Sequence, residues 1–316
     1  MTRRVRMIAA GLSAPLILSL AFLLAACGGG EDTSAGTGTA TAARVDGTPV
    51  NIADKGFTES QIVAQLYAQA LEAVGYTARV TSLGGSEIAH AAITKGEIDM
   101  YPEYTGTAYS VLLKKTDVPP PDEVNATIVD EYATQGLTAL PPAPYSNDNR
   151  VACTKETVDR YGLRTLSDLG ASSGEITYSA NPEHLTRADG LPLLERTYGV
   201  TFKDVKSVAI NLRYRPVEDG QAQCVYAFGT DPQIATLGLV VLEDDRQAFQ
   251  GLPYQNFAVV RTDFLEKQPA LFADTVAKVD ALLTDAAVRE LNGRVDLDKE
   301  DPEEVARDFL RQNGLL

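Results

Sequence analysis

The stretch from Val50 to Met100, VNIADKGFTESQIVAQLYAQALEAVGYTARVTSLGGSEIAHAAITKGEIDM, decides the fold. Short apolar runs at 50–53, 78–82 and 98–100 have the length of buried strands, and the two segments between them have the apolar spacing of helices. This β-α-β-α-β alternation predicts a parallel sheet with helices packed on it. Ligands of such sheets bind at the carboxyl ends of the strands, so binding residues are expected in the turns that follow them.

The two helices carry their own start and stop signals. Thr58, followed three residues later by Gln61, predicts a capping box, and Ser86 is expected to cap the second helix. Gly75 and Gly96 are expected to end the two helices, because glycine accepts the left-handed backbone that often follows a last helical turn.

A second alternating unit follows a proline-rich region and the polar run 146–149. It contains predicted helices at 155–161 and 191–198 and predicted strands at 150–154, 175–179, 206–210, 223–228 and 239–242. The chain is then expected to cross back near 251–260, and the helical tail from Asp263 is expected to cover the first domain. Two α/β domains joined by two crossings predict a ligand cleft, with 48–147 plus 255–316 forming lobe 1 and 148–254 forming lobe 2.

Composition excludes several classes of function. The chain has 316 residues, 44% of them apolar and 22% charged, which is typical of a globular protein. Its 28 basic and 43 acidic residues give a net charge of -15 and offer no basic stripe for a nucleic acid. Two histidines and three cysteines are too few for the usual metal-ligand sets, so we expect neither a metal nor another cofactor.

The amino terminus predicts export. Three arginines precede an apolar run over 7–26, and the sequence Leu24-Ala25-Ala26-Cys27 resembles the lipobox of bacterial lipoproteins. A retained transmembrane helix is the alternative, but Pro15 and the small residues argue against it. We therefore predict a signal peptide over 1–26, a lipidated Cys27 followed by a flexible tether to residue 47, and a lipid-anchored protein on the extracytoplasmic face of a bacterial membrane.

Cys153 and Cys224 remain in an oxidising compartment. A structural disulfide between them and two separate buried thiols are both compatible with the sequence, and the disulfide is favoured.

Several motifs lie in the turns that follow the predicted strands. They are Lys55-Gly56-Phe57-Thr58-Glu59, Leu83-Gly84-Gly85-Ser86, Tyr101-Pro102-Glu103-Tyr104-Thr105-Gly106-Thr107, Arg187-Ala188-Asp189-Gly190 and Ala227-Phe228-Gly229-Thr230-Asp231. In this order and spacing they resemble the substrate-binding lipoproteins of osmoprotectant ABC importers, the glycine betaine, carnitine and choline receptors of the OpuC, ProX and OsmF type. The resemblance runs from about residue 48 to 316 and implies a two-lobed periplasmic-binding-protein-like fold of type II.

The resemblance implies an aromatic cage for a trimethylammonium head, which carries a charge but no hydrogen to donate. It assigns Tyr104 to one ring of the cage, and it places Phe228 and Tyr254 at or near two others. Asn149 falls where the family usually has a further tyrosine. Tyr145 could supply the missing face, or the asparagine could signal a different head group.

The carboxylate end of a betaine needs cations and short hydrogen bonds instead. The resemblance assigns Lys55 and Thr107 to this end, and it makes Arg187 a clamp that closes on it from the second lobe. The implied protein is a monomer and not an enzyme, and it delivers its solute to a permease and, through it, to ATPase subunits.

Three alternatives remain at this point. The cleft could bind another small polar solute such as an amino acid, or the protein could be a sensor that feeds no transporter. A secreted hydrolase is disfavoured because the chain has no Gly-x-Ser-x-Gly elbow and no recognisable nucleophile-base constellation.

Overall fold

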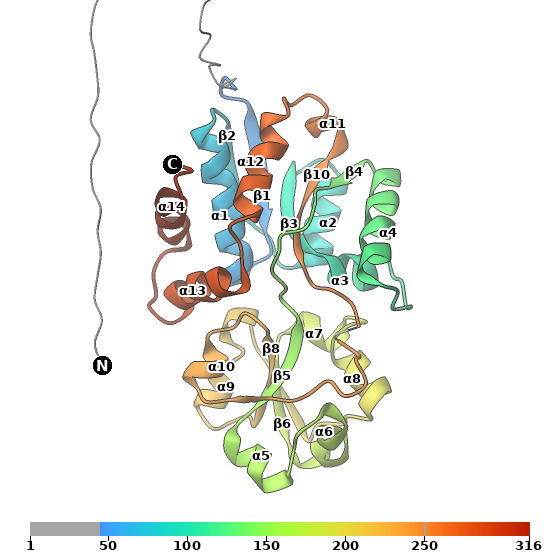
Figure 1. The fold of residues 1–316 in the computed structure, drawn as a ribbon. Helices are drawn as coiled ribbons and strands as arrows, with labels where there is room; N and C mark the ends of the chain where they lie inside the picture. The colour runs from blue at the N-terminus through green and yellow to red at the C-terminus, as the bar shows by residue number, and fades with distance from the viewer. Residues whose placement is uncertain (1–44, 250) are drawn as a thin grey trace, which may run out of the picture. The chain divides into compact units, whose positions relative to one another are not determined.

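The computed structural model describes residues 45–249 and 251–316 (Figure 1). The predicted signal peptide, the lipidation site at Cys27 and the tether up to residue 44 lie outside the described residues. Within the described part of the chain, no helix has both the length and the apolar character needed to cross a membrane.

The first lobe is built on a five-stranded sheet in the order β2-β1-β3-β10-β4. Strand β1 pairs in parallel with β2 and β3, whereas β10 runs antiparallel to β3 and β4. The strand bounds are β1 (Pro49–Asp54), β2 (Thr77–Ser82), β3 (Met100–Tyr104), β4 (Leu137–Ala139) and β10 (Asn256–Arg261). Every residue of β3 is buried, as expected for a central strand with both faces covered.

Helices from both ends of the chain pack on this sheet. Helix α1 contacts the three long helices of the carboxyl-terminal tail, which confirms that the tail covers the first domain. These helices are α1 (Thr58–Ala73), α12 (Leu271–Asp280), α13 (Asp285–Asp296) and α14 (Pro302–Gln312). A second group packs near β3, β4 and β10: α2 (Ser86–Thr94), α3 (Thr105–Thr107), the π-helical turn η1 (Ala108–Leu112), α4 (Pro121–Thr134) and α11 (Thr262–Leu265).

The second lobe repeats this plan with the sheet order β7-β6-β8-β5-β9. Its strands are β5 (Asn149–Cys153), β6 (Thr177–Ala180), β7 (Asp204–Ser207), β8 (Cys224–Phe228) and β9 (Val240–Val241). Its helices are α5 (Lys155–Tyr161), α6 (Leu166–Ser172), η2 (Ser173–Glu175), α7 (Pro182–Thr186), α8 (Leu191–Tyr198), η3 (Ile210–Leu212), α9 (Arg215–Glu218) and α10 (Gln233–Thr236). Alternate residues of β8 enter different apolar clusters, so each face of the sheet has its own core.

Two crossings connect the sheets (Figure 1), one from β4 to β5 and the other from β9 to β10. They run antiparallel to each other at a bridge between Ser146 and Gln255, and the backbone N–H of Asn147 donates to the carbonyl of Tyr254 at 2.9 Å. The two crossings are thus hydrogen-bonded to each other where they connect the sheets.

Cys153 and Cys224 form a disulfide, which confirms the favoured prediction. They are directly opposite each other in the antiparallel pair β5 and β8, and both are fully buried. The bond therefore ties the strand that enters the second lobe to a central strand of its sheet.

Two predicted helix caps are wrong. Thr58 is the first residue of α1 and donates to Asp296 at 2.5 Å instead of capping the helix. Gly85, not Ser86, is the N-cap of α2, and the Ser86 hydroxyl donates to Glu103 at 3.2 Å. In both cases a carboxylate from a distant segment, partly buried at Asp296 and fully buried at Glu103, takes the hydroxyl that local spacing assigns to a cap, so tertiary contacts override the local pattern.

Candidate ligand cavity

A cavity lined by residues of both sheets lies between the two lobes. All of the predicted ligand residues line it: Lys55, Tyr104, Thr107, Asn149, Arg187, Phe228 and Tyr254. Lys55, Tyr104, Thr107 and Phe228 lie at the carboxyl ends of β1, β3 and β8, as the parallel-sheet rule indicates. The rule does not account for the other three residues: Asn149 opens the antiparallel strand β5, Arg187 follows α7, and Tyr254 lies on the return crossing.

Aromatic rings form much of the cavity wall. Phe57 lies 6.2 Å from Tyr104 and 5.7 Å from Phe228 between ring centroids, so it links a ring of the first lobe to one of the second. Tyr226 meets Phe228 edge to face at 5.0 Å. Phe57 and Tyr226 were not among the predicted residues, although the period of two along β8 puts Tyr226 on the same face as Phe228.

Tyr254 reaches this wall because Gly106 has no side chain. A Cβ built on Gly106 would lie 2.7 Å from the ring carbon Cζ of Tyr254, which is closer than side chains tolerate. The glycine in the loop after β3 therefore makes room for a ring from the return crossing.

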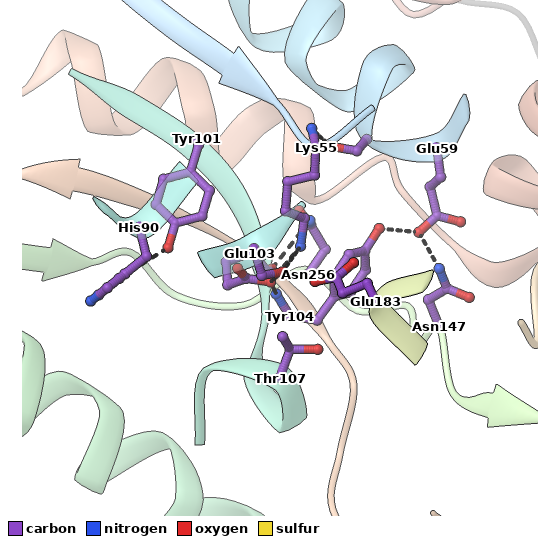
Figure 2. A network of polar contacts seen from close by, with 12 residues as sticks. Lys55, Glu59, His90, Tyr101, Glu103, Tyr104, Thr107, Asn147, Glu183 and Asn256 are labelled. Atoms are coloured by element: carbon purple, nitrogen blue, oxygen red, sulfur yellow. Dashed lines mark hydrogen bonds and ion pairs between the residues drawn. The ribbon is translucent and has the colours of Figure 1, made fainter. Parts of the chain in front are cut away.

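The Lys55 ammonium group binds partners of the first lobe. It forms an ion pair with Glu103, donates to the Ser86 hydroxyl at 3.3 Å and lies 4.3 Å from the centroid of the Tyr104 ring. Figure 2 shows Lys55 and Glu103 meeting beside this tyrosine. Burial lowers the pKa of Lys55, and the charge of Glu103 opposes that effect.

Arg187 connects the lobes. Its Nη2 donates to the Thr107 hydroxyl of the first lobe at 3.1 Å, while Nε and Nη2 form a forked pair with Asp189 at 2.8 and 2.6 Å. The Tyr254 hydroxyl also donates to Asp189, at 3.1 Å. Burial alone would raise the pKa of Asp189, but the Arg187 charge lowers it, so this carboxylate stays ionised and fixes the guanidinium plane.

Glu59, at the start of α1, is a buried acceptor beneath the cavity. Its Oε1 accepts from the Tyr104 hydroxyl at 2.5 Å, the Tyr145 hydroxyl at 3.2 Å and the Asn147 amide at 3.0 Å. Its Oε2 accepts from Thr230 at 2.5 Å and Asn292 at 3.0 Å. Figure 2 shows the Tyr104 and Asn147 branches of this network. Burial raises the pKa of Glu59, and these hydrogen bonds oppose the rise.

Asn149 takes part in a second polar group on the opposite wall. Its Oδ1 accepts from the Tyr226 hydroxyl at 2.6 Å, and the Tyr226 ring stacks on His184 with a centroid distance of 3.7 Å. Burial lowers the pKa of His184 to about 3, so the stacked imidazole is neutral. Tyr145 is not among the cavity-lining residues and its hydroxyl is bonded to Glu59, so it does not supply a ring in place of Asn149.

The described residues contain no group of histidine, cysteine and carboxylate side chains that could hold a metal ion. The cavity thus combines aromatic faces, two paired cations and a set of amides and hydroxyls. Together with the two sheets and the paired crossings, it defines a two-lobed binding protein of the type II periplasmic-binding-protein fold.

Sequence similarity identifies the family to which the chain belongs. The model of the substrate-binding domain of ABC-type glycine betaine transport systems matches residues 48–312, so the chain belongs to this family of osmoprotectant-binding proteins.

Individual relatives agree with this assignment. The chain is 32% identical over 282 residues to a glycine-betaine-binding protein of Pseudomonas aeruginosa, covering 84% of this chain and 88% of that protein. It is 30% identical over 275 residues to the ergothioneine transport permease and binding protein EgtU of Helicobacter pylori, covering 86% of this chain but only 49% of that longer protein. A crystal structure described as a glycine betaine/carnitine/choline ABC transporter superposes with a TM-score of 0.66 at 26% identity, over 84% of this chain and 99% of that one.

Proposed function

We propose that this protein captures a quaternary ammonium solute outside the cytoplasm and delivers it to the permease of an ABC importer. The observation that carries the proposal is the aromatic wall that Phe57, Tyr104, Tyr226, Phe228 and Tyr254 form around one cavity. A trimethylammonium group gains about 0.5 to 2 kcal/mol from each ring face that it contacts, because the cation is attracted to the ring quadrupole.

Two charged side chains of the protein itself support the interpretation that these rings bind a cation. The Lys55 ammonium already lies over Tyr104, and the Arg213 guanidinium lies 4.7 Å from the centroid of Phe228. The protein therefore uses two of these rings as cation partners, and we infer that their remaining surfaces serve a solute in the same way.

The carboxylate of a betaine would be bound beside Lys55 and Arg187. The resemblance assigns Lys55, Thr107 and Arg187 to it, and all three line the cavity. Both cations already have carboxylate partners, Glu103 and Asp189, so the solute would share them rather than meet free charges. We infer from this sharing that the tail adds less affinity than the head and serves mainly to align the solute.

Lobe closure is the proposed mechanism of capture. Arg187 binding to Thr107 and Thr230 binding to Glu59 join the lobes on two sides of the cavity. A solute held between them would favour this closed arrangement, which the permease could then distinguish from an open one. We place the protein on a lipid anchor at Cys27, acting as a monomer with no chemical step.

Calorimetric titration tests the proposal, since the chain has no tryptophan to report closure. The panel is glycine betaine, choline, L-carnitine, ergothioneine and a set of amino acids. We expect saturable binding to at least one quaternary ammonium compound, weakened by roughly 5- to 30-fold in Tyr104→Ala. Heat from an amino acid alone would contradict the proposal and indicate a different class of solute.

A further inference from the structure

Two asparagine side chains in the cavity wall have polar atoms with no partner. Among the described residues, neither Nδ2 of Asn149 nor Oδ1 of Asn181 makes a hydrogen bond, although both atoms are buried. The two residues line the cavity from the second lobe, and they are only 3% and 6% exposed.

Such unpaired atoms are unfavourable, because a buried polar group that loses water needs another partner. Asn147, in the same cavity, shows the usual solution. Its amide nitrogen donates to Glu59 at 3.0 Å and its oxygen accepts from Thr230 at 2.9 Å. The amide of Asn149 has one partner, the Tyr226 hydroxyl. Because a hydroxyl can bind either the oxygen or the nitrogen of an amide, exchanging these two atoms would still leave one of them unpaired.

The plain trimethylammonium solutes do not match this pair of amides. A methylated head has no hydrogen to donate, and a carboxylate can accept from Asn149 but cannot donate to Asn181. A hydroxyl can both accept and donate, so it has the chemistry to bind either amide.

We propose that Asn149 and Asn181 form a specificity subsite that recognises a hydrogen-bonding group, such as a hydroxyl, between the cationic head and the anionic tail of the solute. This inference rests on the proposed function, and it narrows the solute to quaternary ammonium zwitterions with a polar body. Glycine betaine, which has no such group, then binds as a weaker ligand of the same cavity.

The sharpest probe is a matched pair of ligands. L-carnitine and γ-butyrobetaine have the same head, tail and chain length and differ only in one hydroxyl. Calorimetric titration of the wild-type protein should give an affinity about tenfold higher for L-carnitine. In Asn149→Ala and Asn181→Ala this ratio should fall to about twofold or less, while in Asn313→Ala, a change at the far end of α14, it should stay at the wild-type value.

The ratio within one variant is the readout, because it cancels any general loss of affinity caused by a change in the cavity. A thermal unfolding scan identifies a variant that does not fold, and if Asn149→Ala is such a variant, Asn181→Ala decides alone. Equal affinity of the wild type for the two ligands overturns the subsite but leaves the proposed function standing. A tenfold ratio that survives both substitutions also overturns it. Failure of all quaternary compounds to bind overturns both proposals together.

Discussion

The hydroxyl of Tyr104 donates to the carboxylate of Glu59 at 2.5 Å, and the second oxygen of that carboxylate accepts from Thr230 of the other lobe at 2.5 Å. A single buried side chain therefore holds a ring of the cavity and a contact between the lobes. The orientation of the ring and the approach of the lobes are thus linked through one acceptor.

Thr230→Val tests this link, since valine has nearly the same shape but cannot donate to Glu59. We expect the affinity for the solute to fall about five- to tenfold, because the closed arrangement loses a buried hydrogen bond of about 1 kcal/mol. Calorimetric titration measures the effect. Thr236→Val is the matched control, because Thr236 is exposed and its hydroxyl donates to the carbonyl of Pro232, the N-cap of α10. Equal losses in the two variants would show that the Glu59 contact does not contribute to capture.

Gly106→Ala should weaken binding even though the solute is not expected to touch this residue. The new methyl group would lie 2.7 Å from Tyr254, so the ring must move. We expect a loss of about tenfold in affinity with a folded protein. Gly174→Ala is the matched control, because a Cβ there meets no atom within 4 Å. An unchanged affinity in Gly106→Ala would remove Tyr254 from the proposed cage.

Replacing Cys153 and Cys224 together by alanine should destabilise the protein. The disulfide closes a segment with a sequence separation of 71, and such cross-links contribute about 2 to 5 kcal/mol to the free energy of unfolding. Thermal unfolding should show a lower midpoint for the variant. Because both cysteines are fully buried, a reductant should lower the wild-type midpoint only after incubation under partly unfolding conditions. A midpoint equal to that of the wild type would contradict a stabilising role.

Asp280 gives the stability of the protein a defined pH dependence. Burial raises its pKa from 3.8 to about 7, although the Tyr67 hydroxyl donates to it at 2.6 Å. An acid whose pKa is higher in the folded state favours folding at low pH, and this contribution is lost as the pH rises from about 4 to about 7. Above pH 7 the buried charge costs up to a few kcal/mol.

The stability of Asp280→Asn relative to the wild type should therefore increase with pH. Asparagine keeps an acceptor for Tyr67 and removes the charge. Denaturant unfolding of both proteins at pH 5 and pH 8 gives their free energies of unfolding. Subtracting the wild-type value from that of the variant at each pH cancels the contributions of the other titrating groups. A difference that is the same at both pH values would show that Asp280 does not titrate in this range.

Local patterns of sequence predicted most of the fold. Helices α5 and α8 have the predicted bounds, 155–161 and 191–198, because their periodicity and end signals lie within a single segment. The helix caps at Thr58 and Ser86 were wrong because Asp296 and Glu103, which are distant in sequence, bind these hydroxyls.

The cavity residues, too, were predictable only where a local pattern of sequence indicates them. Residues in strand-end motifs, such as Lys55 and Tyr104, could be predicted to meet because topology brings strand ends together. The role of Glu59 could not, because its partners come from both lobes and both ends of the chain and share no local pattern. Tyr226 was missed although the alternation along β8 points to it.

The central claim, that the rings recognise a positive charge, is tested most directly with a ligand and its uncharged isostere. Choline and 3,3-dimethylbutan-1-ol have the same shape and hydroxyl, but a carbon replaces the ammonium nitrogen in the second. Calorimetric titration should show choline binding at least about tenfold more tightly than the alcohol, with this ratio reduced in Tyr104→Ala. Equal affinity for the two compounds would contradict the account, because the cavity would then select its solute by apolar shape alone.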